Sequence, residues 1–197
     1  MLSVRKFFLA TAALATALTL SACSGGMAGM DMGNDAGTTD APTASASYNE
    51  ADIVFAQGML PHHQGAAGMS DVVLAKHGID QAVLDLATEI KAAQEPEIAQ
   101  LTQWLTAWGA DENGMSGMEG MDGTMSSDDM TALQNASGVE ASKLFLEQMT
   151  IHHQGAVDMA QTELNDGQNA DARAMATTIV TTQTDEIAIM KDILATL

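Results

Sequence analysis

The sequence contains one cysteine, Cys23, and few basic residues. A single thiol excludes an intramolecular disulfide. Lysine and arginine together number 7 against 26 aspartates and glutamates, which gives a formal net charge of -19. Phosphate binding needs a basic surface, so nucleic acid is not expected as a partner, and an anionic membrane surface would repel the chain. Such acidity favours solubility and raises the local concentration of metal cations.

Long apolar runs are also absent, because the only candidate covers residues 7–20 and is too short to span a bilayer. It follows Arg5 and Lys6 and precedes small residues, which is typical of a secretory signal over residues 1–22. The tetrapeptide ending at Cys23 resembles a bacterial lipobox, which implies lipidation of that cysteine. We therefore expect a lipoprotein anchored to the outer face of a bacterial membrane. A signal without lipidation, or an uncleaved anchor, is the alternative.

Composition divides the mature chain into four parts. Residues 23–48 are rich in Met, Gly and Asp and are predicted to be a flexible tether. Residues 49–108 and 138–197 are rich in Ala, Leu, Gln and Glu with apolar residues three or four apart, which predicts a helical hairpin in each. Residues 109–137 form a Met/Gly-rich linker that contains a short helical turn, which we expect Ser127 to cap.

The two hairpins are an internal repeat. Phe55 matches Phe145 at a shift of 90 residues, and "QEPEI" at 94–98 matches "QTDEI" at 183–187 at a shift of 89. A lone hairpin of this size buries little core, so the repeat predicts an all-α, four-helix bundle made from both hairpins. Pairing of each hairpin with one from another chain, in a homo-oligomer, is the alternative.

Four of the five histidines lie in two copies of His-His-Gln-Gly-Ala. On a helix, each copy places two methionines and two histidines within an arc of about 120°. Thioether sulfur with imidazole suits Cu(I), and imidazole with carboxylate suits Cu(II) or Zn(II). We therefore predict two related copper sites, open also to silver or zinc. Their ligands are Met59, His62, His63 and Met69 in the first copy and Met149, His152, His153 and Met159 in the second.

The alternative for these side chains is structural. One histidine of each pair would pack in the core with a carbonyl or glutamine partner while the other faces solvent, and the methionines would be ordinary core residues. His77 has no counterpart in the other repeat and is expected only to end a helix.

The tether and the linker repeat the methionine theme outside the helices. Solvated Gly/Asp-rich segments offer methionine no buried position, so we interpret these residues as a flexible capture arm for Cu(I) or Ag(I). Compositional drift is the alternative. The residues concerned are Met27, Met30, Met32, Met115, Met118, Met121 and Met125.

With its paired phrases and the "QxxEI" of the following helices, the chain resembles the domain of unknown function 305 family. The resemblance covers about residues 49–108 and 127–197 and implies an extracytoplasmic, ferritin-like bundle, in a family with copper-binding members of the CopM type. The family's phrase falls on the eight residues already named. The copies differ, because the first has Pro61 and Gly68 where the second has Ile151 and Asp158, so we expect the second to bind more tightly.

Enzyme chemistry is not expected. A di-iron oxidase needs Glu-x-x-His motifs, which are absent, and the matched pair Glu97 and Glu186 is too few carboxylates for such a site. No Gly-x-Ser-x-Gly is present for nucleophilic hydrolysis. The sequence favours sequestration, tolerance or delivery of copper, with a copper-exchanging protein as partner. Two alternatives stay open: a structural or interaction lipoprotein without metal, and a protein whose sites cycle Cu(I) and Cu(II).

Overall fold

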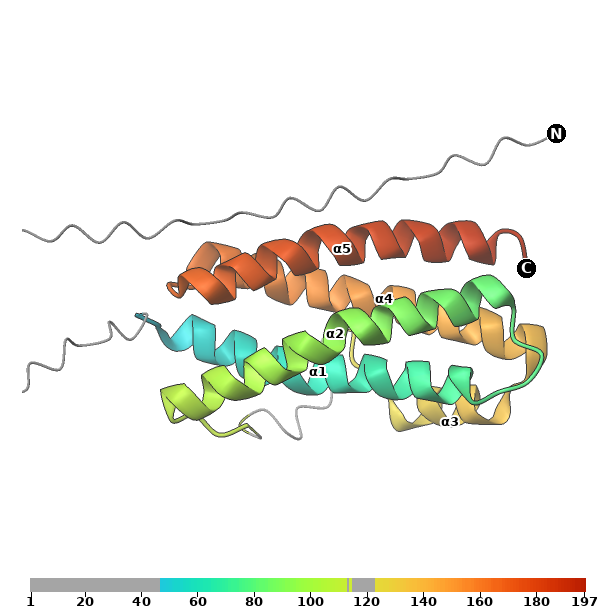
Figure 1. Ribbon diagram of the computed structural model, residues 1–197, viewed down its shortest axis with the longest axis horizontal. Coiled ribbons are helices and arrows are strands. Elements are labelled where there is room, and N and C mark those ends of the chain that lie inside the picture. The colour runs from blue at the N-terminus through green and yellow to red at the C-terminus, as the bar shows by residue number, and fades with distance from the viewer. Residues whose placement is uncertain (1–46, 113, 115–122) are drawn as a thin grey trace, which may run out of the picture. The chain divides into compact units, whose positions relative to one another are not determined.

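In the computed structural model, the described residues are 47–112, 114 and 123–197. They form five helices and no strand: α1 (Glu50–Leu74), α2 (Gln81–Trp108), α3 (Ser127–Asn135), α4 (Gly138–Asp166) and α5 (Ala170–Leu194). The predicted all-α bundle of two helical hairpins is confirmed, with α1 against α2, α4 against α5, and the hairpins meeting mainly through α1 and α4 (Figure 1). Cys23 and six of the seven predicted capture-arm methionines lie outside the described residues. The seventh, Met125, is partly buried against the bundle core, so the expectation that its segment offers methionine no buried position was wrong for this residue.

Local sequence signals set the helix starts. Asn49 caps α1 in a reciprocal capping box, because its side chain accepts from the backbone N–H of Asp52 and the Asp52 carboxylate accepts from the N–H of Asn49. Ser126 caps α3 in the same way with Asp129. The prediction that Ser127 caps this helix was therefore wrong by one residue, since the capping box requires an acidic residue three positions after the cap.

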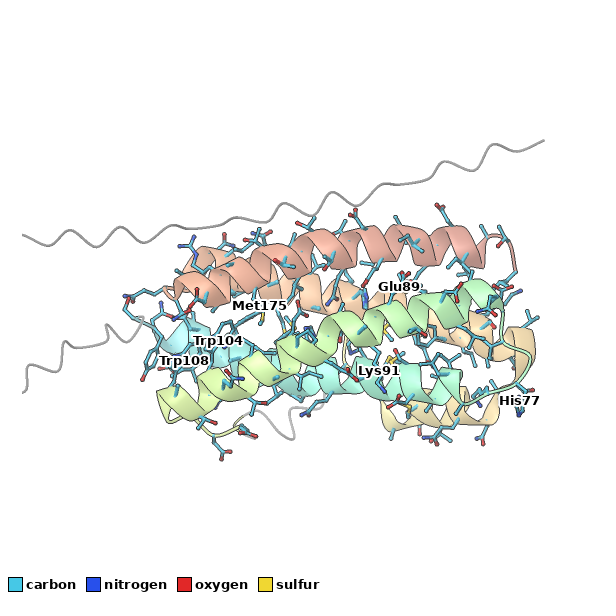
Figure 2. All side chains as sticks on the ribbon, viewed as in Figure 1. His77, Glu89, Lys91, Trp104, Trp108 and Met175 are labelled. Carbon is cyan, nitrogen blue, oxygen red and sulfur yellow. The ribbon has the colours of Figure 1, made fainter. Side chains whose placement is uncertain are left out.

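α1 runs without interruption through Pro61. A proline inside a helix has no N–H to give to the carbonyl one turn earlier, here that of Gln57. The alternative of a helix that begins at Pro61 is excluded. α1 ends at Leu74, so His77 lies beyond it, exposed in the connection to α2 (Figure 2).

α1 and α4 run in opposite directions (Figure 1), and two separate buried clusters result from this. Core 1 combines the second half of α1 with the first half of α4, and core 2 combines the first half of α1 with the second half of α4. Each core is completed by the partner helices α2 and α5. Buried members of core 1 include Met69, Val73, Ile90, Leu133, Phe145 and Met149, and those of core 2 include Phe55, Met59, Leu101, Leu105, Ala156 and Ile179.

Both ends of the bundle carry additional ties. At one end, the Lys76 ammonium donates to the carbonyls of Gln134 and Ala136, at 2.7 and 2.8 Å, and so holds the end of α3 against α1. At the other end, two tryptophan rings of α2 (Figure 2) and the ring of Tyr48, two residues before α1, stack in a row. The rings of Trp104 and Trp108 lie 5.7 Å apart, and Tyr48 stacks on Trp108 at 5.0 Å.

Gly123, a linker residue ahead of α3, lies directly on the backbone of α4. Its φ is +87°, and an added Cβ would stand 2.8 Å from the Cα of Gly155 and 3.0 Å from the carbonyl oxygen of His152. We expect Gly123→Ala to lower the free energy of unfolding by about 2 kcal/mol, since both the left-handed backbone and the close approach disfavour a side chain.

The matched control is Gly68→Ala, which lies inside α1 with nothing within 4 Å of the added Cβ. Alanine is the better helix former, so this variant should gain about 0.5–1 kcal/mol. Thermal unfolding followed by circular dichroism measures both. Equal effects of the two substitutions would contradict the close contact between the linker and α4.

Candidate metal site

His62 of α1 and His152 of α4 meet where the two helices cross. Their ring centroids lie 3.6 Å apart at an interplanar angle of 39°, and both residues are 1% exposed. The Nε2 of His152 donates to the backbone carbonyl of His62 at 3.0 Å. A Cβ added at Gly65 would lie 3.5 Å from the His152 Nε2, in ordinary van der Waals contact, so this residue borders the pair closely. The two repeats thus contribute to one layer, which separates core 1 from core 2.

His63 and His153 flank this pair and are each held by a glutamate of the partner helix. The Nε2 of His63 lies 2.8 Å from Glu97 of α2, and the Nε2 of His153 lies 2.6 Å from Glu186 of α5. A carboxylate on one ring nitrogen fixes the tautomer, orients the ring and makes the other nitrogen a better ligand. The four histidines and these two glutamates together form what we call the histidine layer.

Several ring nitrogens of the layer have no hydrogen-bond partner among the described residues. These are both nitrogens of His62 and the Nδ1 atoms of His63, His152 and His153. A buried polar atom without a partner costs free energy, and such atoms are uncommon. The layer thus contains five imidazole nitrogens for which the described residues supply no partner.

Burial keeps the two central histidines neutral. It lowers the pKa of His62 far below its usual range, and the charges of the neighbouring histidines lower it further. Burial likewise lowers the pKa of His152 to about 3, with His153 and His63 adding to the shift. Neutral imidazole is the form that binds a metal, so these two residues need not lose a proton before they do so at neutral pH.

The predicted methionine ligands are divided between the two sides of the histidine layer. Met59 is fully buried in core 2, and Met69 and Met149 are fully buried in core 1. Met159 is partly buried at the edge of core 2, where it lines a pocket with Val54. The two methionines of one repeat therefore face different cores, and each core receives one from each repeat.

Within the described residues, no group of three or more His, Cys, Asp and Glu side chains is arranged to hold a metal ion. A metal in the histidine layer would therefore need a donor of another kind in addition to the imidazoles. Met59 and Met149 each lie three residues before a central histidine, on the adjoining face of the same helix. Sulfur at these positions fits a soft ion such as Cu(I) or Ag(I).

Sequence reasoning noticed Glu97 and Glu186 as repeated residues but did not pair them with histidines. The signal was the repeated "QxxEI", which also contains Gln94 and Gln183. Both glutamines are buried, and the Gln94 amide has no partner for its oxygen or its nitrogen among the described residues. The repeated phrase therefore marks the face of α2 and α5 that closes the histidine layer.

The two copies differ in structure, and the expectation that the second binds more tightly stays a prediction. Asp158 is exposed, and its carboxylate accepts from the Gln154 side chain at 3.1 Å on its own helix. The inequality lies at the centre of the layer, where His152 has a hydrogen bond and His62 has none among the described residues.

The family model for DUF305, a domain of unknown function, matches residues 52–194. The chain belongs to the DUF305 family. None of the curated proteins matches it. A DUF305 protein from Streptomyces coelicolor has a similar structure, with 32% identity and a TM-score of 0.69 over 74% of this chain and 91% of that one. A DUF305 fragment from Deinococcus radiodurans is 29% identical, with a TM-score of 0.70 over 76% and 98%.

Solved structures of CopM are similar to this DUF305 chain as well. The Cu(II)-bound form is 29% identical, with a TM-score of 0.65 over 74% of this chain and 96% of CopM. The Cu(I)-bound form is 28% identical, with a TM-score of 0.61 over 72% and 93%, and silver-bound forms also match. The likeness confirms the predicted membership of this family and extends over both helical hairpins.

Proposed function

We propose that this chain is an extracytoplasmic copper-binding protein that sequesters or delivers the ion and is not an enzyme. The observation that carries the proposal is His62, a buried imidazole with no partner for either ring nitrogen among the described residues. It lies 3.6 Å from a second buried imidazole contributed by the other repeat. The similarity to copper-bound and silver-bound CopM supports the same ions as cargo.

His62 and His152 are the proposed central ligands, with thioether sulfur from Met59 and Met149. His63 and His153, oriented by Glu97 and Glu186, supply further nitrogen donors or hold the layer in register (2.8 and 2.6 Å). Neutral nitrogen and sulfur donors favour Cu(I) over harder cations. The acidic surface would attract the cation toward the protein.

Lipidation of Cys23 is the proposed anchor, and the signal sequence before it supports export. None of the helices in residues 47–112 and 123–197 is long and apolar enough to cross a membrane. The Met-rich tether and linker are proposed to collect ions and pass them to the histidine layer, and a copper-exchanging protein would receive them.

The test is the metal content of the chain from residue 23 onward after loading with Cu(I) and removal of loosely held ion. We expect the variant with all four paired histidines changed to Gln to lose the most tightly bound copper. His77→Gln should retain it, because His77 is exposed in the connection between α1 and α2 (Figure 2) and does not belong to the histidine layer. Helical content measured by circular dichroism confirms that both variants fold.

Equal copper retention in the two variants would exclude the histidine layer as the site. The competing function, a structural lipoprotein without metal, predicts that added copper and silver leave thermal unfolding unchanged. An ion that binds only the folded state must raise its stability, by about 2.7 kcal/mol when present at one hundred times its dissociation constant.

A further inference from the structure

Asp52, in the first turn of α1, connects that helix to the turn between α4 and α5. Its side chain is fully buried and accepts hydrogen bonds from three backbone N–H groups. The donors are Asn49 at 2.5 Å, Asn169 at 2.8 Å and Gln168 at 3.1 Å. A carboxylate held by several N–H groups is strongly stabilised in its charged form, so Asp52 carries a negative charge at neutral pH.

Glu163, near the end of α4, is 1% exposed and lies against Asp52. Neither of its carboxyl oxygens receives an N–H or O–H from another described residue. Two ionised carboxylates have no donor between them, so their contact is a hydrogen bond only when one of them is protonated. The carboxyl is also packed against Gly167, where an added side chain would collide with it. This packing keeps Glu163 from turning away to solvent.

We propose that Asp52 and Glu163 share one proton and form a latch that ties the start of α1 to the α4–α5 turn and weakens as the pH rises. The charged groups around the pair are few. Glu50 of α1 and Asp166 of α4 line the same pocket and are acidic, and Arg173 of α5 is the nearby cation that favours ionisation of Glu163. With carboxylates on two sides, loss of the proton would leave two buried like charges in contact.

The titration behaviour agrees with this geometry. Burial, the hydrogen bond to Asp52 and the charge of Asp52 raise the pKa of Glu163 to about 8. Burial alone would raise the pKa of Asp52 too, but the N–H groups of Asn49, Asn169 and Gln168 and the bond from Glu163 outweigh it and hold that pKa below its usual range. The pair therefore binds one proton at neutral pH.

The internal repeat shows that the fold does not require an ionisable pair here. At a shift of 90, Asp52 corresponds to Ser142 and Glu163 corresponds to Val73. The Ser142 hydroxyl accepts from the N–H of Asp80 at 3.1 Å, the same connection that Asp52 makes with Asn169. The other end of the bundle thus makes this tie with a hydroxyl and an apolar neighbour, which do not titrate.

The direction of the pH effect is set by proton linkage. A carboxyl whose pKa is raised by folding contributes stability that is fully present below its unfolded value, near 4.5, and is lost as the pH rises through about 8. Between these limits the folded state holds a proton that the unfolded state does not, so each pH unit raises the unfolding constant by up to about tenfold. Above that range the contribution of Glu163 is constant.

The experiment compares the pH dependence of thermal unfolding in the wild-type chain and in Glu163→Gln, which keeps a donor for Asp52 but cannot ionise. We expect the wild-type Tm to fall from about pH 5 to 8 more steeply than that of Glu163→Gln. Glu140→Gln, an exposed acid in the first turn of the same helix, should keep the wild-type slope. The double variant Asp52→Ser/Glu163→Val copies the other end of the bundle and should also lose the extra slope.

Carbon NMR of the Glu163 carboxyl in the wild-type chain gives a readout that needs no variant. A midpoint near 8 supports the shared proton, and one near 4.5 overturns it. Equal slopes of Tm against pH in the wild type and Glu163→Gln would overturn it as well. Metal content enters none of these measurements, so the outcome is separate from that of the copper proposal.

Discussion

Replacing His62 with leucine is expected to raise the Tm of the metal-free protein and to remove its tight copper binding. His62 is buried with both ring nitrogens unpaired among the described residues. A buried polar group without a partner costs about 1–3 kcal/mol, and leucine of similar volume does not incur this cost. We expect a gain of about 1–2 kcal/mol. The bond from His152 is made to the His62 backbone carbonyl, so it survives the change.

The matched control is His63→Leu, one residue further along α1. His63 pairs with Glu97 at 2.8 Å, and its loss leaves a mostly buried carboxylate without its partner. We expect this variant to lose about 1–3 kcal/mol. Thermal unfolding of metal-free protein, together with competition for Cu(I) against a coloured chelator, measures both properties. If His62→Leu loses as much stability as His63→Leu, His62 contributes to the stability of the metal-free protein. That result would contradict the interpretation of His62 as a residue that serves metal binding at a cost in stability.

The largest loss of stability is expected from Phe145→Ala in core 1. Phe145 is fully buried against α1, α2 and α5 residues of that core, so removing its ring leaves a cavity that its neighbours fill poorly. Substitutions of this kind cost about 3–5 kcal/mol. Unfolding in denaturant measures the loss, provided that the slope of the unfolding free energy against denaturant concentration is the same in the variant and the wild type.

The repeat supplies the comparison, because Phe55 is the counterpart of Phe145. Phe55 is 4% exposed and lines a pocket of ≈ 460 Å³ between α1 and α4, so part of its surroundings is already open. We expect Phe55→Ala to cost clearly less than Phe145→Ala. Equal losses of unfolding free energy in the two variants would show that the open pocket beside Phe55 does not lower the cost of removing its ring.

The hairpins and the bundle were predictable because helical periodicity and the repeat are both local patterns. The first hairpin was predicted over residues 49–108 and its helices span residues 50–108, and the second was predicted over residues 138–197 and its helices span residues 138–194. The eight predicted ligands were chosen as two faces, one on each helix. A single helix does not reveal which part of a partner helix it crosses, so the meeting of His62 with His152 and the division of the methionines between two cores depend on the antiparallel packing.

The two histidine–glutamate pairs and the pair of Asp52 and Glu163 could not be predicted, because each depends on how separate helices pack. Glu97 and Glu186 are visible as a repeat, but their pairing with His63 and His153 depends on the register between the helices of each hairpin. Asp52 and Glu163 are far apart in sequence and have no ionisable counterpart in the other repeat, so a search for repeated chemistry passes over them.

Each hairpin supplies one half of the histidine layer. His62 and His63 come from α1 with Glu97 from α2, and their counterparts come from α4 and α5. An ion held between the central pair would therefore cross-link the two halves of the chain, much as a disulfide would in a protein with thiols to spare. Release of the ion would remove that cross-link and leave the two hairpins joined by the apolar cores on either side of the histidine layer. On the proposed function, unloading the ion would therefore also weaken the attachment of one hairpin to the other.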